Sequence, residues 1–416
     1  MSLNEMNCLV AQSGGPTSAI NSSLSGVIEA SLENSSINTI YGAINGIQGV
    51  LRDEILNLSE LFDKPSSINT LKTTPSMFLG SCRYKLPTQE DNLDEYKRIF
   101  AFFDKYNIKF FFYIGGNDSM DTVLKLNNYA VENNYDIRIM GIPKTIDNDL
   151  MDTDHTPGFG SAAKYVATTL LEISHDAYCY NIPSVTIVEI MGRNAGWLTA
   201  ASALARNDYI NTPDLIYLPE VAFCTNQFIA DIKEIQKTKK NVIIAVSEGI
   251  KDETGQYISA TAAPNDSFGH AQLSGTGHRL EQLIKESIDC KIRSVELNVL
   301  QRSAAHIASL TDIMEASEIA KKAVEFAVNG ETGKMVTMHR TKNAPYTIEI
   351  TTIPVSQVAN KEKKIPREWI NDKGNNVNQP LIDYIKPLIQ GEVKTEFNNG
   401  LPTFFPITHL TQRNHY

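Results

Sequence analysis

The sequence predicts an α/β protein with parallel sheets, built as two three-layer α/β/α (Rossmann-like) domains and a C-terminal extension. Short apolar runs typical of buried strands alternate with longer runs of helical periodicity, an order that produces parallel sheets covered by helices. Several of these strands end in glycines or charged side chains, which is typical of the ligand-binding edge of such sheets. A chain of 416 residues is long enough for two domains with substantial cores.

The composition is that of an ordinary globular protein, with 42% apolar and 21% charged residues. The net charge of −10 argues against a general nucleic-acid binder, although it leaves room for a local anion pocket. The longest apolar run, near residues 110–114, is far too short to span a membrane, and residues 1–5 show no secretory signal. The five cysteines are scattered and lack C-x-x-C spacing, so we expect reduced thiols in a cytoplasmic protein, with neither disulfides nor a zinc site.

The first predicted strand, residues 9–11, ends in a turn that contains Gly14 and Gly15, and a helix with an apolar face follows at residues 20–28. Ser18 is the expected N-cap of this helix. A strand, a glycine turn and a helix N-terminus together form an anion site. A tight turn without a ligand would show the same pattern, and the residues alone favour neither reading. The chain contains no G-x-x-x-x-G-K-[ST] phosphate loop.

A second strand, residues 110–114, runs into Gly115 and Gly116, and helical spacing follows at residues 123–130. The two glycines allow a phosphate to approach the backbone closely. Asp118 comes next, and beside a phosphate it would need a metal or a lysine to neutralise it. Taken alone, Asp118 is more simply interpreted as a cap of the helix.

A third apolar run, residues 137–142, leads into the most informative stretch of the chain, residues 143–149. Lys144 can hold an anion, Asp147 can take a proton, and Asp149 can bind a hard cation such as Mg²⁺. Together these groups suit phosphoryl transfer, in which positioning and charge neutralisation dominate. The alternative is a polar turn, because Asp-Asn-Asp runs are common in turns.

Further strands are expected at residues 185–190, 215–218, 242–247, 295–300, 335–339 and 347–353, and further helices at 158–176, 315–328 and 380–389. An arginine at a strand end, such as Arg193, suits a phosphoryl group because its charge is permanent and its donors are forked. A lone arginine on a loop, such as Arg83, is more often a solvated charge. Charged residues stand next to three of these predicted strands: Arg193 follows residues 185–190, Glu248 follows 242–247, and Arg293 precedes and Arg302 follows 295–300. Arg83 and Lys85 follow Gly80 on a loop.

Taken in order and spacing, these motifs resemble those of the phosphofructokinase family over most of residues 7–340. Each motif is weak alone, but the series is specific, chiefly through Thr-Ile-Asp-Asn-Asp at 145–149 and Met-Gly-Arg at 191–193. The resemblance implies a donor-binding domain at 1–160, completed by about 303–357, a fructose-6-phosphate-binding domain at 161–302, and an extension at 358–416. The active site is then expected between the two domains.

The resemblance implies that the protein transfers a phosphoryl group to the 1-hydroxyl of fructose 6-phosphate and uses Mg²⁺. By that match Asp147 is the general base, Thr145 lies beside the transferred group, and Arg193 neutralises its charge. The implied substrate-binding residues are Thr145, Asp147, Met191, Gly192, Arg193, Glu248, Arg302 on the 6-phosphate, and Arg293, which reaches a neighbouring subunit's substrate. The implied donor-binding residues are Gly14, Gly15, Arg83, Gly115, Gly116, Asp118, Ser119 and Lys144, and the implied metal ligands are Asp118 and Asp149. A homodimer or homotetramer is expected.

Asp118 and Lys144 indicate which phosphoryl donor is used. In the ATP-using members of the family, small residues match both positions and leave room for a nucleotide. The large, oppositely charged pair here resembles the pyrophosphate-dependent branch, because a lysine neutralises pyrophosphate while Asp118 obstructs a longer donor by bulk and like charge. The same reasoning predicts that Asp118 and Lys144 pair when the site is empty.

Some positions depart from the family pattern. Asn117 stands where most members have a metal-associated aspartate, so it offers Mg²⁺ only a carbonyl oxygen, and Ser184 replaces an arginine that contacts the neighbour's sugar phosphate. Val299 and residues 303–305 also differ from the usual substrate neighbours, which leaves sedoheptulose 7-phosphate open as an acceptor. The alternatives to a pyrophosphate-dependent enzyme are an ATP-dependent 6-phosphofructokinase and a non-catalytic regulatory homologue.

Overall fold

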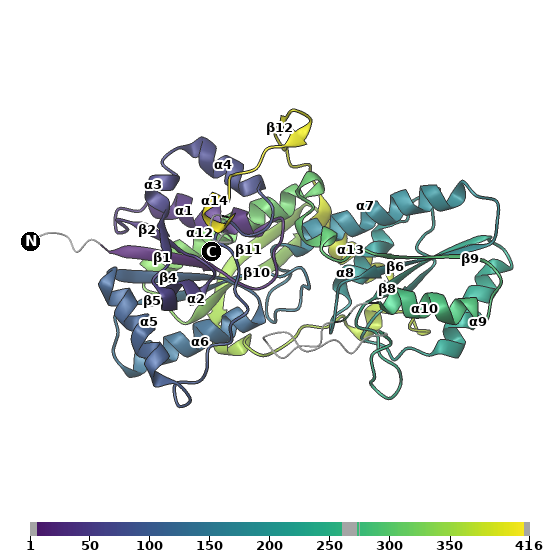
Figure 1. Cartoon of the computed structure of the whole chain (residues 1–416), viewed down its shortest axis with the longest axis horizontal. Helices are drawn as coiled ribbons and strands as arrows, with labels where there is room; N and C mark the ends of the chain where they lie inside the picture. The colour runs from purple at the N-terminus through teal and green to yellow at the C-terminus, as the bar shows by residue number, and fades with distance from the viewer. Residues whose placement is uncertain (1–5, 260–272, 274, 412–416) are drawn as a thin grey trace, which may run out of the picture.

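The structure is a computed structural model that describes residues 6–259, 273 and 275–411 (Figure 1). Residues 1–5, for which the sequence predicts no secretory signal, lie outside this part. Two sheets organise the chain, each covered by helices on both faces, so the predicted α/β class is confirmed. Within the described residues, no helix is both long and apolar enough to cross a membrane.

The larger sheet has seven strands in the order β11-β10-β5-β4-β1-β2-β3. Its parallel centre places β1 between β4 and β2, and β4 between β5 and β1. The two outer pairs, β10 with β11 and β2 with β3, are antiparallel, so the expectation of wholly parallel sheets is wrong at these edges. The strands are β1 (Asn7–Gln12), β2 (Ile40–Ala43), β3 (Ile55–Asn57), β4 (Ile108–Gly115), β5 (Arg138–Pro143), β10 (Lys334–Asn343) and β11 (Tyr346–Pro354).

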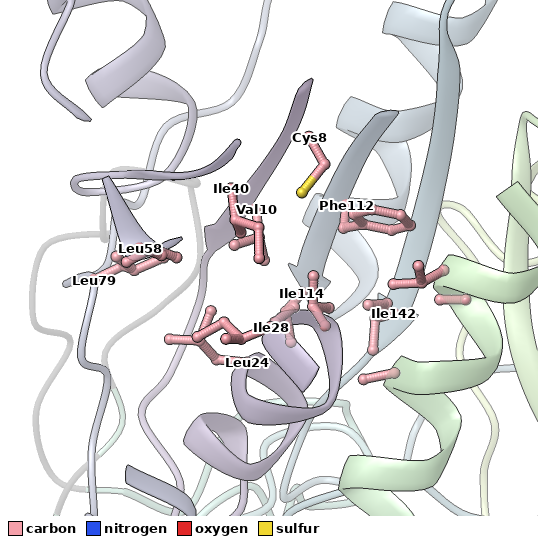
Figure 2. Packing of buried hydrophobic residues seen from close by; sticks show 14 of the residues in the cluster. Cys8, Val10, Leu24, Ile28, Ile40, Leu58, Leu79, Phe112, Ile114 and Ile142 are labelled. Atoms are coloured by element: carbon pink, nitrogen blue, oxygen red, sulfur yellow. The ribbon is translucent and has the colours of Figure 1, made fainter. Parts of the chain in front are cut away.

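Alternating side chains of the central strands divide between two apolar layers. Val10 and Phe112 face helices α1 (Ile20–Leu32) and α12 (Leu310–Val328), and Figure 2 shows Leu24 and Ile28 of α1 packed over this face. Their neighbours Leu9 and Phe111 point to the other face, which α5 (Leu93–Lys105) and α6 (Asn117–Glu132) cover. The period-two alternation of the strands thus produces the three-layer arrangement.

The smaller sheet has four parallel strands in the order β7-β8-β6-β9. Helix α7 (Phe159–Tyr178) covers one face, and α9 (Thr225–Gln236) and α10 (Thr276–Lys285) cover the other (Figure 1). The strands are β6 (Ser184–Ile190), β7 (Leu215–Tyr217), β8 (Asn241–Ser247) and β9 (Lys291–Glu296). The predicted domain boundaries stay a prediction.

The C-terminal extension packs against both halves of the chain. Val358 and Ala359 join the apolar layer of the larger sheet, whereas Ile365, Ile370 and Leu381 join that of α7 in the smaller sheet. The predicted helical piece at 380–389 forms as α13 (Gln379–Ile385) and a 3₁₀ turn at Lys386–Ile389. The remaining short elements are α2 (Ile47–Arg52), α3 (Leu58–Leu61), α4 (Pro65–Thr73), α8 (Trp197–Ala200), α11 (Leu300–Ser303), α14 (Thr408–Thr411), β12 (Phe397–Asn398), β13 (Leu401–Pro402) and 3₁₀ turns at Ala201–Ala205, Ala305–Ile307, Val355–Gln357 and Arg367–Trp369.

Two local predictions are wrong. Ser18 does not cap α1; the Thr17 hydroxyl instead accepts from the backbone N–H groups of Ala19 (3.2 Å) and Ile20 (2.9 Å), one residue earlier than expected. The strand predicted at 295–300 is β9, which ends at Glu296 because Asn298 adopts a left-handed conformation (φ 40°) that asparagine tolerates.

One helix begins earlier than predicted. Helix α12 starts at Leu310 rather than near residue 315, because the Ser309 hydroxyl accepts a hydrogen bond from the N–H of Asp312 and caps the helix.

Candidate active site

Three loops meet at the carboxyl edge of the larger sheet because β1, β4 and β5 are neighbours there. The loop after β1 carries Gly14 and Gly15, the loop after β4 carries Gly116, and the loop after β5 carries Lys144. Backbone bonds tie the loops together: the N–H of Ser13 donates to Ile114 O (3.0 Å) and the N–H of Lys144 to Gly115 O (2.9 Å). Motifs more than 100 residues apart in sequence therefore form one surface.

The glycines on these loops have distinct reasons to be glycine. A side chain at Gly115 would collide with Ser119, the third residue of α6, so this glycine allows the helix to pack closely on the strand end. Gly14 has a φ of 82°, and a Cβ there would lie 3.1 Å from the Lys144 ammonium. Gly116 is loosely packed, because a Cβ there would meet only Lys144 O at 3.7 Å and Thr145 at 3.9 Å, and a ligand in the cavity can approach its backbone.

Lys144 is almost fully buried, and its ammonium donates to Gly15 O at 2.8 Å. The ammonium is therefore bound to the first glycine turn, and its predicted pairing with Asp118 in the empty site stays a prediction. Burial lowers the pKa of Lys144 to about 7, because the nearby Asp147 and Asp149 only partly offset the cost of a buried charge. An incoming anion would favour the charged ammonium, so binding of a phosphate and protonation of Lys144 are coupled.

The loop from Thr145 to Asp149 is held by side chains as well as by backbone. The Thr145 hydroxyl accepts from the N–H of Asp147 (3.1 Å). Asn148 has a φ of 53° and turns inward, where its amide donates to the Tyr384 hydroxyl (2.9 Å) of α13. This inward turn of Asn148 leaves the flanking carboxylates, Asp147 and Asp149, facing the cavity.

The facing wall comes from the smaller sheet and from α11. Glu248 follows β8, and its carboxylate accepts from the N–H of Gly192 (3.3 Å). The side-chain oxygen of buried Gln301 accepts from the N–H of Met191 (3.4 Å). These bonds hold the 191–193 turn beside Arg302, and the Nε–H of Arg193 is buried without a protein acceptor.

The two walls enclose one cavity of about 520 Å³, within the usual size for a small-molecule site. Among the residues predicted for the site, Gly115, Gly192 and Arg293 do not line it. Arg293 lies on β9 and pairs instead with Asp176 at 3.0 Å. The predicted residues that do line the cavity are Gly14, Gly15, Arg83, Gly116, Asn117, Asp118, Ser119, Lys144, Thr145, Asp147, Asp149, Met191, Arg193, Glu248 and Arg302.

Three carboxylates of the cavity, those of Asp147, Asp149 and Glu248, have raised pKa values. Burial raises the pKa of Asp147, although Arg302, Arg193 and Lys144 oppose the shift. Burial and the repulsion of Asp147 raise the pKa of Asp149 to about 7. Burial likewise raises the pKa of Glu248 to about 7. Groups poised near neutral pH in a cleft are typical of sites that move protons or bind charged ligands.

Sequence reasoning missed the contribution of the C-terminal extension. Asn360 and Glu362 line the cavity, although composition alone marks this region only as a polar, lysine-rich tail. The Asn117 side chain, considered as a weak metal ligand, is engaged with the same segment: its oxygen accepts from the N–H of Asn360 (2.5 Å) and its amide donates to Lys361 O. No sequence pattern links positions so far apart.

Chemically, the cavity combines a cationic end with a carboxylate-rich middle. Lys144 and the glycine backbone suit a compact phosphate donor. Arg193 and Arg302 suit phosphate groups of an acceptor or a transferred phosphoryl group, since guanidinium binds phosphate through paired donors. Asp147 lies within the electrostatic reach of Lys144, Arg193 and Arg302.

Comparison with known proteins agrees with this geometry. The phosphofructokinase family model matches residues 7–327. The chain is 40% identical to a pyrophosphate–fructose 6-phosphate 1-phosphotransferase of Halomonas elongata, over 95% of this chain and 94% of that protein. It is 38% identical to one of Methylococcus capsulatus, over 97% and 96% respectively. The crystal structure of a pyrophosphate-dependent phosphofructokinase from Nitrosospira multiformis superposes with a TM-score of 0.87, at 37% identity, over 96% of this chain and 95% of that chain.

Proposed function

The chain belongs to the phosphofructokinase family, and on that premise we propose that it transfers a phosphoryl group from pyrophosphate to the 1-hydroxyl of fructose 6-phosphate. The products are fructose 1,6-bisphosphate and phosphate, and the reaction is reversible because its two sides lie closer in free energy than those of the ATP reaction. The observation that carries this proposal is the buried Lys144, which fills the donor end of the cavity and places a cation against the Gly14–Gly15 turn.

Asp147 is the proposed general base. Its carboxylate takes the proton of the 1-hydroxyl as that oxygen attacks the terminal phosphorus, and the bridging P–O bond of pyrophosphate breaks to release phosphate. A raised pKa suits this role, because a base that titrates closer to the working pH also returns the proton in the reverse reaction. Thr145 supports it by holding the N–H of Asp147.

Arg193 and Arg302 are the proposed phosphate-binding cations of the acceptor wall. The buried Nε–H of Arg193 has no protein acceptor, so it is available to the charge of the transferred group. Arg302 binds the 6-phosphate, and Met191 and Glu248 contact the sugar.

Magnesium is the proposed cofactor, and the donor set fits it as an open site. The predicted ligands Asp118 and Asp149 present carboxylates to one cavity, as do Asp147 and Glu362. Among the described residues, however, no three acidic, histidine or cysteine side chains converge tightly enough to hold an ion alone. Mg²⁺ commonly binds in this way, through one or two carboxylates, several waters and substrate phosphates. When bound, the ion neutralises the donor's phosphate oxygens.

A homodimer or homotetramer is proposed because Arg293 lies apart from this chain's own cavity. It lines a small hollow with Asp176 and Ser184 at the edge of the smaller sheet, where a neighbouring subunit could approach. Sedimentation of the purified protein, with Arg293→Ala as the variant, tests whether an oligomer forms and whether this arginine serves its neighbour.

The direct test is an assay of the purified protein with fructose 6-phosphate and Mg²⁺, with pyrophosphate and ATP supplied separately. We expect turnover with pyrophosphate and little with ATP. Turnover with ATP alone would favour the ATP-dependent alternative. Binding of fructose 6-phosphate without turnover in the presence of either donor would favour the alternative of a non-catalytic regulatory homologue. Sedoheptulose 7-phosphate, used as a second acceptor, tests the substrate preference.

A further inference from the structure

Residues 360–363, here called the strap, cross one side of the cavity and are bound on the donor side by Asn117. Asn117 is the first residue of α6, and its side chain makes both of its bonds to the strap backbone, at Asn360 and Lys361. The Asn360 side chain adds a bond to Asp121 (3.0 Å) one turn further along α6. The strap is therefore attached to the start of the helix that carries Asp118.

The other end of the strap is bound by the acceptor wall. The Glu362 carboxylate accepts from the Asn194 amide at 2.7 Å, next to Arg193. Lys363 O accepts from the indole N–H of Trp197 at 3.0 Å, and the N–H of Lys363 donates to Asp149 O at 2.7 Å. The strap thus joins the donor loops, the Asp147–Asp149 loop and the acceptor wall, and in Figure 1 the yellow-green chain after β11 passes between the two sheets.

Asn117 performs a task that an aspartate could not. Its amide must accept from one backbone group and donate to the next, and a carboxylate has no proton to donate to Lys361 O. The negative charge absent at position 117 is present instead at Glu362, which lines the same cavity. Glu362 lies close enough to Asp147 and Asp149 to repel both. Such a concentration of charge is costly beside an anionic donor unless a cation lies between them.

We propose that the strap is a working part of the active site: Asn117 is its positioning residue, and Glu362 is the carboxylate that it presents to the magnesium–pyrophosphate complex. This inference rests on the proposed function. It differs from the simpler view of Asn117 as a weakened metal ligand, and the two views predict opposite effects of one substitution.

The test measures binding of methylenediphosphonate, a pyrophosphate analogue that cannot transfer its phosphoryl group, by titration calorimetry of the full chain with Mg²⁺ and with EDTA. Glu362→Gln keeps an oxygen for the Asn194 amide and removes only the charge. We expect it to weaken binding about 10-fold or more with Mg²⁺, the usual effect of removing a group that supports a metal. With EDTA its binding should be unchanged or tighter, because a repelling charge is gone.

Asn117→Asp is the decisive variant. It breaks the bond to Lys361 O and sets a carboxylate against that carbonyl, so we expect it also to weaken Mg²⁺-dependent binding by about 10-fold. The matched control is Asp372→Asn, an exposed carboxylate of the same extension that does not line the cavity, which should bind like the wild type in both conditions.

Two outcomes would overturn the inference. Tighter Mg²⁺-dependent binding by Asn117→Asp would show that position 117 is a metal ligand. An equal change in affinity for Glu362→Gln with and without Mg²⁺ would show that Glu362 only holds the strap in place and does not act on the metal. Trp197 fluorescence, read in a Trp369→Phe background because the two rings lie 6.1 Å apart, reports whether the strap is in place. Asn117→Ala replaces Asn117→Asp if the latter does not fold. Absence of any wild-type binding would contradict the proposed function itself, which separates the two failures.

Discussion

At the scale of single residues, Asp147 owes its proposed role to its neighbours. It is a carboxylate enclosed by protein, and the cations around it come from three separate segments, at Lys144, Arg193 and Arg302. Asp147→Asn keeps the size and removes the base, so kcat should fall by about 10²–10⁴ while KM for fructose 6-phosphate changes little. Steady-state kinetics and thermal denaturation would check this; near-normal turnover by a folded variant would remove Asp147 from the role.

Variants of Lys144 and Asp118 test which phosphoryl donor the protein uses, again at the scale of single residues. Lys144→Gly removes the cation that faces the first glycine turn, so pyrophosphate use should fall severely, by about 100-fold or more, which corresponds to the loss of a buried charge-assisted bond. The double variant Asp118→Gly with Lys144→Gly should raise ATP use relative to pyrophosphate use, because it clears bulk and charge from the donor end. Lys97→Gly on α5, an exposed lysine that does not line the cavity, serves as the control. A double variant that gains nothing with ATP would contradict this explanation.

At the scale of elements, the loop from Thr145 to Asp149 depends on α13 for its shape. The Tyr384 hydroxyl accepts from the buried Asn148 amide (2.9 Å) and donates to Asp154 O (2.5 Å). Tyr384→Phe removes both bonds and leaves a buried amide poorly satisfied, which costs about 1–3 kcal/mol of stability. Because the carboxylates on both sides of Asn148 would shift, kcat should fall by about 10- to 100-fold. Tyr209→Phe, at an exposed position, should change neither stability nor kcat. A Tyr384→Phe variant with unchanged kcat would show that α13 does not determine the shape of the loop.

At the scale of the whole molecule, a buried ionic network joins segments from three parts of the fold. His155 contacts Asp154 (2.8 Å) and Glu315 of α12 (2.7 Å), and Asp154 also pairs with Arg340 of β10 (2.8 Å). Burial disfavours the charged imidazolium, but Glu315 and Asp154 outweigh that effect and raise the pKa of His155 to about 9. An unfolded histidine titrates near 6.5.

The network makes stability depend on pH in a defined direction. Since the folded pKa lies above the unfolded one, the stabilisation from His155 is complete below about pH 6.5 and is lost as pH rises through about 9. We expect the stability difference between the wild type and His155→Gln to fall over this range by roughly 1–3 kcal/mol, measured by urea denaturation of both proteins at a series of pH values, because the comparison removes the contributions of other titrating groups such as Lys144. His155→Gln should be less stable at pH 6 and should show a flatter profile. A stability difference between the two proteins that stays constant or grows from about pH 6.5 to about 9 would show that the imidazolium is not stabilised.

Short-range sequence patterns were sufficient to predict much of the fold and of the candidate site. Glycines directly after apolar runs, and lysine and carboxylates after a third run, predicted the α/β class and most residues that line the cavity, because the carboxyl ends of parallel strands necessarily share an edge of the sheet. The order and spacing of these motifs indicated the family. The antiparallel strand pairs at both edges of the larger sheet were not predicted. Several boundaries were also wrong: at α1, at α12 and at the end of β9, single side chains and one left-handed residue decided where the elements began and ended.

Only the tertiary structure decided what the extension and Asn117 do. The bond between Asn117 and Asn360 joins positions 243 residues apart, and such a contact leaves no periodicity, composition or spacing to find in the sequence. Asparagine at position 117 looks like the loss of a metal-associated acid when it is compared with a motif, yet in the fold it is the one side chain there that can both donate to and accept from the strap. The sequence by itself determined the chemistry of each loop, because that depends on residue types near strand ends. The tertiary structure determined which distant segment completes the cavity, because that depends on hydrogen bonds that exist only once the chain has folded.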